Sequence, residues 1–188
     1  MGEFDDDLID DQPQAQLTHL TASGEAHMVD IGDKQPSVRL ASAAGMVLLG
    51  TECVALLRDG SIPKGDALAV ARIAGIMGAK RTPDIIPLCH PLPLSGVDVH
   101  LHVYDTGVEI RATVRTTYST GVEMEALTAV STAALALIDM VKAVDKHARI
   151  TDVRVTAKSG GRSGDWREAE PPASAASGDV WDESDFVS

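Results

Sequence analysis

The clearest structural signal in this sequence is a β-hairpin. Residues 97–117 read VDVHLHVYDTGVEIRATVRTT, in which apolar and polar side chains alternate on both sides of Asp105-Thr106-Gly107. Alternation with a period of two predicts strands with one buried face, and a short polar turn containing glycine joins two such strands in an antiparallel pair. The chain must therefore build a sheet around this hairpin and cover one of its faces.

Helical patterns on both sides of the hairpin would supply this cover. Residues 51–57 predict a short helix with Thr51 as its N-cap. Residues 65–80 predict a second helix, with Asp66 near its start, where the helix dipole favours a carboxylate. Residues 122–146 carry the longest helical pattern in the sequence and are rich in Ala, Leu and Met.

The remaining segments are candidates for strands. Residues 150–158, ITDVRVTAK, predict a final strand, and residues 27–34, HMVDIGDK, predict a short β-segment that enters a turn. Residues 37–50 form an apolar stretch that fits either a strand or a helix. The order strand, helices, hairpin, long helix, strand favours an α+β fold, in which helices pack on one face of an antiparallel sheet.

The net charge of −12 is concentrated at the two ends of the 188-residue chain. Residues 1–11 hold six acids and no base, and residues 165–188 hold seven acids and one arginine. Residues 12–164 contain fifteen acids and fifteen Lys or Arg. We therefore expect acidic disordered tails at 1–16 and 167–188 around one catalytic α+β domain at 17–166.

A neutral body excludes several classes of protein. A nucleic-acid reader is expected to carry a net basic face with aromatic side chains for stacking, and this chain has only six aromatic residues. No apolar run approaches the ~20 residues that span a bilayer, and the N-terminus is acidic, unlike a signal peptide. We expect a soluble, cytoplasmic protein that binds neither nucleic acid nor membrane.

An adjacent cysteine and histidine lie in a proline-rich segment, IIPLCHPLPL, at residues 85–94. The prolines favour extended backbone, and neighbouring side chains of an extended chain point to opposite sides, so Cys89 and His90 are poorly placed to form a dyad. A zinc site needs more ligands, and Cys53 is the only other cysteine. A metalloprotein is a minority alternative, and His90 is either a structural or a ligand-facing residue.

Polar groups suggest a phosphate-bearing ligand with a nitrogen-rich ring. Lys64 directly precedes a predicted helix, where it is either solvated or placed to bind an anion. Lys158 and Arg162 flank two glycines whose amides could turn toward an anion. Glu123 and Glu125 either cap the long helix or converge on ring nitrogens.

A further acid lies near the end of the long helix. Asp139 is followed by Lys142 and Lys146 on the same helical face, and its sequence neighbours are apolar. These residues form either an ordinary surface ion pair or a partly buried pair that transfers protons. On one continuous helix, the glutamate pair would lie ~21 Å from Asp139. The two groups serve separate sites or meet across a subunit interface, and we favour the interface.

Five blocks of the sequence resemble, in order, those of the MoaC family, the cyclic pyranopterin monophosphate synthases of molybdenum cofactor biosynthesis. They are LTHLTASGEAHMVDI, KGDALAVARIAGIMGAKRTPDIIPLCHPL, TGVEMEALTA, DMVKAV and AKSGGRSGDW. The resemblance implies a ferredoxin-like α+β fold and a homohexamer, a trimer of dimers with active sites at subunit interfaces. The implied substrate is 3′,8-cyclo-7,8-dihydro-GTP, supplied by a radical enzyme.

The implied reaction is that of a lyase, in which the substrate rearranges to cyclic pyranopterin monophosphate and releases diphosphate. No redox change is involved, so no cofactor is required, although a divalent ion such as Mg²⁺ can accompany the triphosphate. The resemblance implies that the catalytic residues are Asp139, Lys142 and Lys64, and that no residue binds a resident metal.

The resemblance also assigns the substrate contacts. Arg39 and Lys158 match cationic positions for the triphosphate, and Ser119 stands where the family pattern has a basic residue. The implied contacts to the purine or pterin and the residues beside them are Leu88, Cys89, His90, Glu123, Met124 and Glu125. An alternative function from another class is a non-catalytic nucleotide-binding regulator, which would need the phosphate cations but not Asp139 or Lys142.

Overall fold

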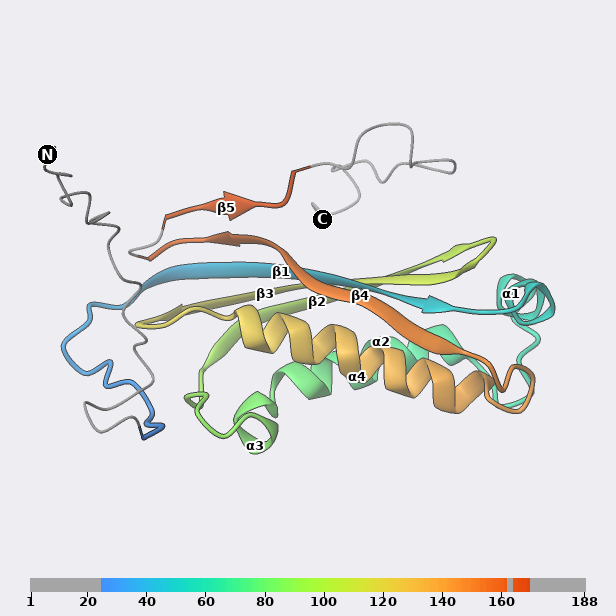
Figure 1. The fold of residues 1–188 in the computed structure, drawn as a ribbon, viewed down its shortest axis with the longest axis horizontal. Helices are drawn as coiled ribbons and strands as arrows, with labels where there is room; N and C mark the ends of the chain where they lie inside the picture. The colour runs from blue at the N-terminus through green and yellow to red at the C-terminus, as the bar shows by residue number, and fades with distance from the viewer. Residues whose placement is uncertain (1–24, 162–163, 170–188) are drawn as a thin grey trace, which may run out of the picture.

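A computed structural model describes residues 25–161 and 164–169 of the chain (Figure 1). Its elements are β1 (Ser37–Leu48), α1 (Thr51–Arg58), α2 (Ala67–Ala79), α3 (Thr82–Ile85), β2 (Leu94–Tyr104), β3 (Gly107–Tyr118), α4 (Glu123–Val141), β4 (Arg149–Ser159) and β5 (Trp166–Arg167). The five strands form one antiparallel sheet in the order β2-β3-β1-β4-β5. This arrangement confirms the predicted α+β, ferredoxin-like fold.

Strand β1 occupies the centre of the sheet and resolves the ambiguity of residues 37–50. It pairs with β3 on one side and with β4 on the other. Ala43 faces the helices and is 1% exposed, while Ala44 on the opposite face is 2% exposed. A strand that is paired at both edges and buried on both faces reads as a continuous apolar run, and for this reason its pattern did not distinguish strand from helix.

Helices α2 and α4 lie side by side on one face of the sheet (Figure 1). Small residues at their contact allow a close approach. A Cβ added to Gly78 of α2 would lie 2.7 Å from Cβ of Thr132 in α4, and one added to Gly75 would lie 3.0 Å from the Ala129 carbonyl oxygen. Close helix packing through Gly and Ala explains how the chain builds a core with so few aromatic side chains.

Helix α4 also corrects one expectation about the sequence. Among the described residues, it is the one helix that is long and apolar enough to cross a membrane by length and hydropathy. The expectation that no apolar stretch approaches this length was therefore wrong. Val130 and Leu137 of α4 are fully buried against the rest of the fold. The apolar composition of α4 is that of a core helix, which passes the same test as a membrane span.

Two helix ends differ from their predicted positions. Gly50, not Thr51, is the N-cap of α1, and its amide donates to Oδ2 of Asp145 at 2.7 Å. Asp145 also accepts from the amide of His147 at 2.8 Å. Helix α4 ends at Val141, short of the predicted residue 146, because the chain after it turns to place Asp145 at the start of α1.

Three short segments were also not predicted correctly. Residues 27–34 form no strand: only Ala26 makes a single bridge, and a turn follows at 32–34. The short helix α3 and the two-residue strand β5 were not predicted, since neither is long enough to show a periodic pattern.

The predicted tail boundary at residue 167 falls inside an ordered contact. The amide of Glu168 donates to the Thr156 carbonyl oxygen at 2.7 Å, and Nε of Arg154 donates to the Glu168 carboxylate at 2.7 Å. Residues 1–16 and 170–188 lie outside the described residues, and the predicted disorder of the tails stays a prediction.

The contact between α2 and α4 predicts that Gly78→Ala lowers the free energy of unfolding by about 1–3 kcal/mol, because the added methyl overlaps Thr132. Helix propensity alone predicts the opposite sign, since alanine favours a helix over glycine by ~1 kcal/mol. Urea denaturation measures the difference. Gly96→Ala is the matched control, since its Cβ would lie no closer than 3.4 Å to Arg115. A stabilised Gly78→Ala variant would contradict close packing at this point.

Candidate active site

A pocket of about 450 Å³ lies at the N-terminal end of α4. Its walls come from the segment before β1, from the proline segment and from the start of α4. All six residues expected to lie beside the purine or pterin line it: Leu88, Cys89, His90, Glu123, Met124 and Glu125. The fold thus brings together residues that are about 35 positions apart in the sequence.

The proline segment forms a fixed wall of this pocket. Ile86 ends α3 with extended backbone, φ −106° and ψ 105°, as expected of a residue before proline. The Cys89 amide then donates to the Ile86 carbonyl oxygen at 3.1 Å, and Oγ1 of Thr116 holds the Pro93 carbonyl at 2.7 Å. This turn interrupts the alternation of a straight strand, so Cys89 and His90 both line the pocket.

Burial, and then the charge of Glu125, raise the pKa of the Cys89 thiol. A neutral thiol is a poor nucleophile and a poor metal ligand. The described residues contain no group of three or more His, Cys, Asp or Glu side chains that could hold a metal ion. Cys89 therefore contributes to the pocket by packing.

Two carboxylates enter the pocket from the first turn of α4. The Glu125 residue is 3% exposed, and burial raises its pKa to about 7, with a smaller contribution from the charge of Glu123 and an opposing one from its own backbone N–H. Glu123 is one-third exposed and lies 3.6 Å from Nζ of Lys158. The N-cap, Val122, makes no side-chain hydrogen bond. The Glu125 carboxylate accepts from its own backbone N–H, so Glu125 both satisfies a first-turn amide and lines the pocket.

The two cationic positions lie on adjacent strands, Arg39 on β1 and Lys158 on β4. Nε of Arg39 is buried and has no hydrogen-bond partner among the described residues. The Gly160 amide donates to Oδ1 of Asp165 at 3.0 Å, so it is engaged within the chain and does not form the anion-binding amide suggested by the sequence. Arg162 lies outside the described residues.

A second polar cluster lies at the other end of α4. Nζ of Lys64 donates to the Asp139 carbonyl oxygen at 2.6 Å and to its carboxylate at 3.2 Å, and Nζ of Lys142 lies 2.7 Å from the same carboxylate. Hydrogen bonds from Lys142 and then from Lys64 lower the pKa of Asp139. The carboxylate thus stays ionised between two ammonium groups.

The surroundings of Asp139 correct the expected apolar setting. Its side chain is 58% exposed, because its apolar sequence neighbours point into the core and it points away from them. Lys146 lies beyond the end of α4 and does not share the helical face predicted for it. In a single chain the Asp139 cluster is therefore a solvated ion-pair cluster.

The two clusters occupy opposite ends of α4 (Figure 1). Fourteen residues separate Glu125 from Asp139, which at 1.5 Å per residue is ~21 Å along the helix. One small molecule cannot contact both groups within a single chain. The pocket supplies carboxylates, an imidazole and nearby cations, and the second cluster supplies groups that can exchange protons.

A family model described as the MoaC family matches residues 28–161. The chain belongs to the MoaC family. A relative from Streptomyces griseus named cyclic pyranopterin monophosphate synthase is 66% identical over 158 residues, which cover 84% of this chain and 89% of the relative. One of the same name from Nocardioides sp. is 60% identical over 161 residues, or 84% of this chain and 98% of the relative.

A third MoaC relative, from Mycobacterium tuberculosis, is named cyclic pyranopterin monophosphate synthase 2. It is 58% identical over 156 residues, which cover 83% of this chain and 93% of the relative. The similarity therefore includes both ends of α4, where the two clusters lie.

Several pocket residues were not predicted from the sequence. Val29, Ile31 and Lys34 line the pocket from the segment that precedes β1. Ser119, where the resemblance implied a basic residue, donates from Oγ to the Lys34 carbonyl oxygen at 2.8 Å. Ser119 thus holds this segment in place. The apolar residues Val29 and Ile31 of HMVDIGDK, two positions apart, led to the prediction of a β-segment, whereas they line the pocket from a loop.

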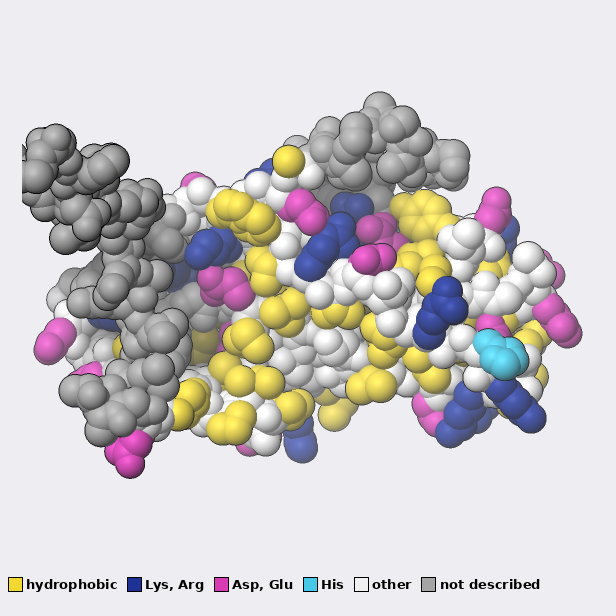
Figure 2. All heavy atoms as spheres, viewed as in Figure 1, with side chains coloured by type: hydrophobic (Ala, Val, Ile, Leu, Met, Phe, Trp, Pro, Cys, Tyr) yellow, Lys and Arg dark blue, Asp and Glu magenta, His cyan; other side chains and the backbone are white. Residues whose placement is uncertain are grey.

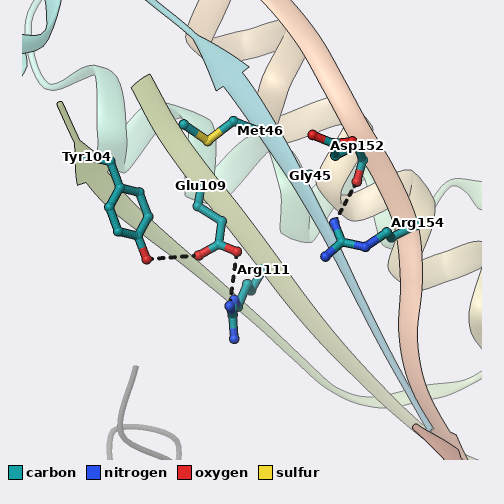
Figure 3. A pocket seen from close by; sticks show the side chains of 7 residues that line it. All are labelled: Gly45, Met46, Tyr104, Glu109, Arg111, Asp152 and Arg154. Atoms are coloured by element: carbon teal, nitrogen blue, oxygen red, sulfur yellow. Dashed lines mark hydrogen bonds and ion pairs between the residues drawn. The ribbon is translucent and has the colours of Figure 1, made fainter. Parts of the chain in front are cut away.

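A second hollow, of about 280 Å³, lies on the sheet face opposite the helices (Figure 3). No predicted site residue lines it. Tyr104 and Arg111 both bond the Glu109 carboxylate, at 3.3 and 3.0 Å, and Nη1 of Arg154 donates to the Asp152 carbonyl oxygen at 3.0 Å. Because it is smaller and none of the expected site residues line it, it is the weaker candidate for the ligand site.

The raised pKa of Glu125 predicts a pH dependence of stability. Between about pH 4.5 and 7 the folded chain keeps a proton that the unfolded chain releases, so stability falls as pH rises through this interval. Glu125→Gln removes the loss of stability that comes from ionising this buried carboxyl group. Above pH 7 it should therefore raise the free energy of unfolding by on the order of 2 kcal/mol relative to the parent chain.

Urea denaturation from pH 4.5 to 8 tests this expectation. Glu52→Gln, at an exposed glutamate in α1, serves as the control and should leave the pH dependence unchanged. If Glu125→Gln shows the same pH dependence as the parent chain, Glu125 does not titrate near neutrality.

Proposed function

We propose that the chain is a cyclic pyranopterin monophosphate synthase of molybdenum cofactor biosynthesis. In this proposal it converts 3′,8-cyclo-7,8-dihydro-GTP to cyclic pyranopterin monophosphate and releases diphosphate, as a lyase. The observation that carries the proposal combines sequence similarity with the geometry of the pocket. The chain is 58–66% identical to named synthases over most of its length. It also places all six expected ring-contact residues around one pocket.

The pocket offers suitable chemistry for the ring system of this substrate. The carboxylate oxygens of Glu123 can accept hydrogen bonds from ring N–H groups, while Glu125, with a pKa of about 7, can donate or accept near neutrality. Arg39 and Lys158 lie close to the same end of α4 and are proposed to bind the triphosphate. Cations at these positions would stabilise the charge that develops as diphosphate leaves.

The Asp139 cluster is proposed to move the protons of the rearrangement. Ring opening, pterin closure and cyclic phosphate formation each need a proton donor or acceptor at a defined atom. Asp139 holds Lys64 and Lys142 within 3.2 Å of one carboxylate, so the two ammonium groups are fixed next to each other. Enclosing this cluster in an interface would remove it from water and place its two ammonium groups beside a substrate bound by the neighbouring subunit.

The site is proposed to form between subunits of a homohexamer, a trimer of dimers. The separation of ~21 Å between the clusters supports this assembly, as does an exposed apolar surface on the helical layer (Figure 2). This surface includes Ile73, Met77 and Leu135, which are 54–62% exposed. Apolar surface of this kind favours association with a second copy. Sedimentation analysis that finds an active monomer would contradict the assembly.

No organic cofactor takes part in the proposed reaction, because the rearrangement involves no net oxidation or reduction. A divalent ion such as Mg²⁺ would enter with the triphosphate. We place the reaction in the cytoplasm, together with the radical enzyme that would supply the substrate.

The proposal predicts that Asp139→Asn and Lys142→Ala each lower kcat by about 100-fold or more, the usual contribution of general acid–base groups. The assay follows formation of the pterin product from the cyclised GTP intermediate, with and without Mg²⁺. Lys146→Ala is the matched control, because this exposed lysine lies near the cluster but outside α4. It should retain full activity.

The same experiment separates catalysis from simple nucleotide binding. A regulator that binds the intermediate without converting it would give no product with the parent chain. A synthase whose turnover is unchanged in Asp139→Asn and Lys142→Ala would contradict the proposed role of this cluster.

A further inference from the structure

Gly121 lies directly before α4 and lines the pocket. A Cβ added to it would lie 2.9 Å from Cδ and 3.1 Å from Oε1 of Glu123, and still closer to Oε2. The carboxylate of Glu123 thus occupies the space that the side chain of any other residue at position 121 would need. The backbone does not require glycine here, since Gly121 is not among the glycines with positive φ.

The other described glycines near the site differ from Gly121 in this respect. Gly160 and Gly161 have φ values of 85° and 90°, so their backbone conformation alone favours glycine. Positions 75 and 78 need glycine because α2 packs closely on α4 and leaves no room for a side chain. Gly121 combines ordinary backbone with a missing Cβ whose space is filled by a carboxylate of the pocket.

We propose that Gly121 is a positioning residue for the reaction: its missing side chain seats the Glu123 carboxylate beside Lys158 and next to Glu125. This inference rests on the proposed function, which assigns the pocket to the ring of the substrate. In this position the Glu123 carboxylate connects the ring pocket with the proposed triphosphate site, because it lines the pocket and pairs with a cation on β4 at 3.6 Å. Gly121 itself need not touch the substrate.

Replacing Gly121 by alanine should move this carboxylate without unfolding the chain. The atoms in the way belong to the far end of a flexible side chain, not to backbone. Glu125 is buried and closes the inner side of the pocket wall, whereas one-third of the Glu123 side chain is exposed. The Glu123 carboxylate would therefore turn toward solvent, away from Lys158 and Glu125.

Two consequences follow for Gly121→Ala. The KM for the cyclised GTP intermediate should rise about tenfold, the loss expected for one hydrogen bond to a charged group, with a smaller change in kcat. The pKa of Glu125 should fall, because the charge of Glu123 contributes to raising it. A merely structural glycine would not change this pKa.

The experiment compares Gly121→Ala, Glu123→Ala and the double variant, with Gly96→Ala as the glycine control. KM is measured for each, and ¹³C NMR of labelled glutamate carboxyls gives the pKa of Glu125. Because Gly121 acts through Glu123, the alanine at 121 should have no further effect on KM or on this pKa once Glu123 is removed. Gly96→Ala should match the parent chain.

Each outcome decides the inference. An unchanged KM and an unchanged Glu125 pKa in Gly121→Ala would overturn it, as would equal effects of Gly121→Ala with and without Glu123. If Gly121→Ala lowers thermal stability, the loss should vanish in the Glu123→Ala background. A loss that persists there would contradict the proposal that Gly121 makes room for the Glu123 carboxylate. If the parent chain forms no product, the proposed function fails. The NMR titration still tests whether Gly121 positions the Glu123 carboxylate.

Discussion

The packing of α4 beside α2 and against the sheet is the constraint on which the rest of this structure depends. Small residues such as Gly75 and Gly78 let the two helices approach closely, and Gly45 of β1 gives the same access to Val130 of α4. The result is one straight, buried helix that carries functional groups at both ends. Because the helix is rigid, its length fixes the separation of those groups, and the proposed site would need them from different chains.

The two ends of α4 also differ in electrostatic character. At the first turn, burial and a neighbouring carboxylate raise the pKa of Glu125 to about 7. Near the last turn, two lysines lower the pKa of Asp139 and keep it ionised. One end thus offers a carboxyl group that changes protonation near neutrality, and the other offers ammonium groups held by a fixed anion. The proposed rearrangement, with several proton transfers, could use both kinds of group.

Much of the fold and of the candidate site could be predicted from the sequence. The hairpin around Asp105 and Gly107, the helix capped by Asp66 and the grouping of Glu123 with Glu125 depend on local patterns, which a sequence displays directly. The pocket wall formed by Val29 and its neighbours depends on where a loop lies against distant elements. The local sequence pattern therefore predicted a β-segment there instead of a loop. The same limit explains why Gly50 replaced Thr51 as N-cap, since Asp145 approaches from a distant part of the chain.

The exposure of Asp139 shows the other limit of sequence patterns. Its apolar neighbours suggested burial, but they belong to the inner face of α4, and the aspartate lies on the outer face. In the proposed assembly, a partner subunit would enclose it. The resemblance to the MoaC family implies such an assembly, which stays a prediction, whereas periodicity alone left the Asp139 cluster as either a surface ion pair or a partly buried pair.

The most direct test of a site shared between subunits is complementation. A chain with a damaged pocket, His90→Ala with Glu123→Ala, is co-expressed with an Asp139→Asn chain, and mixed assemblies are isolated through two different affinity tags. Each variant alone should be inactive. Random mixing should restore about one quarter of the parent activity, because about half of the dimers are mixed and one of the two sites in each mixed dimer receives both intact halves. Mixed assemblies that form but remain inactive would contradict a shared site.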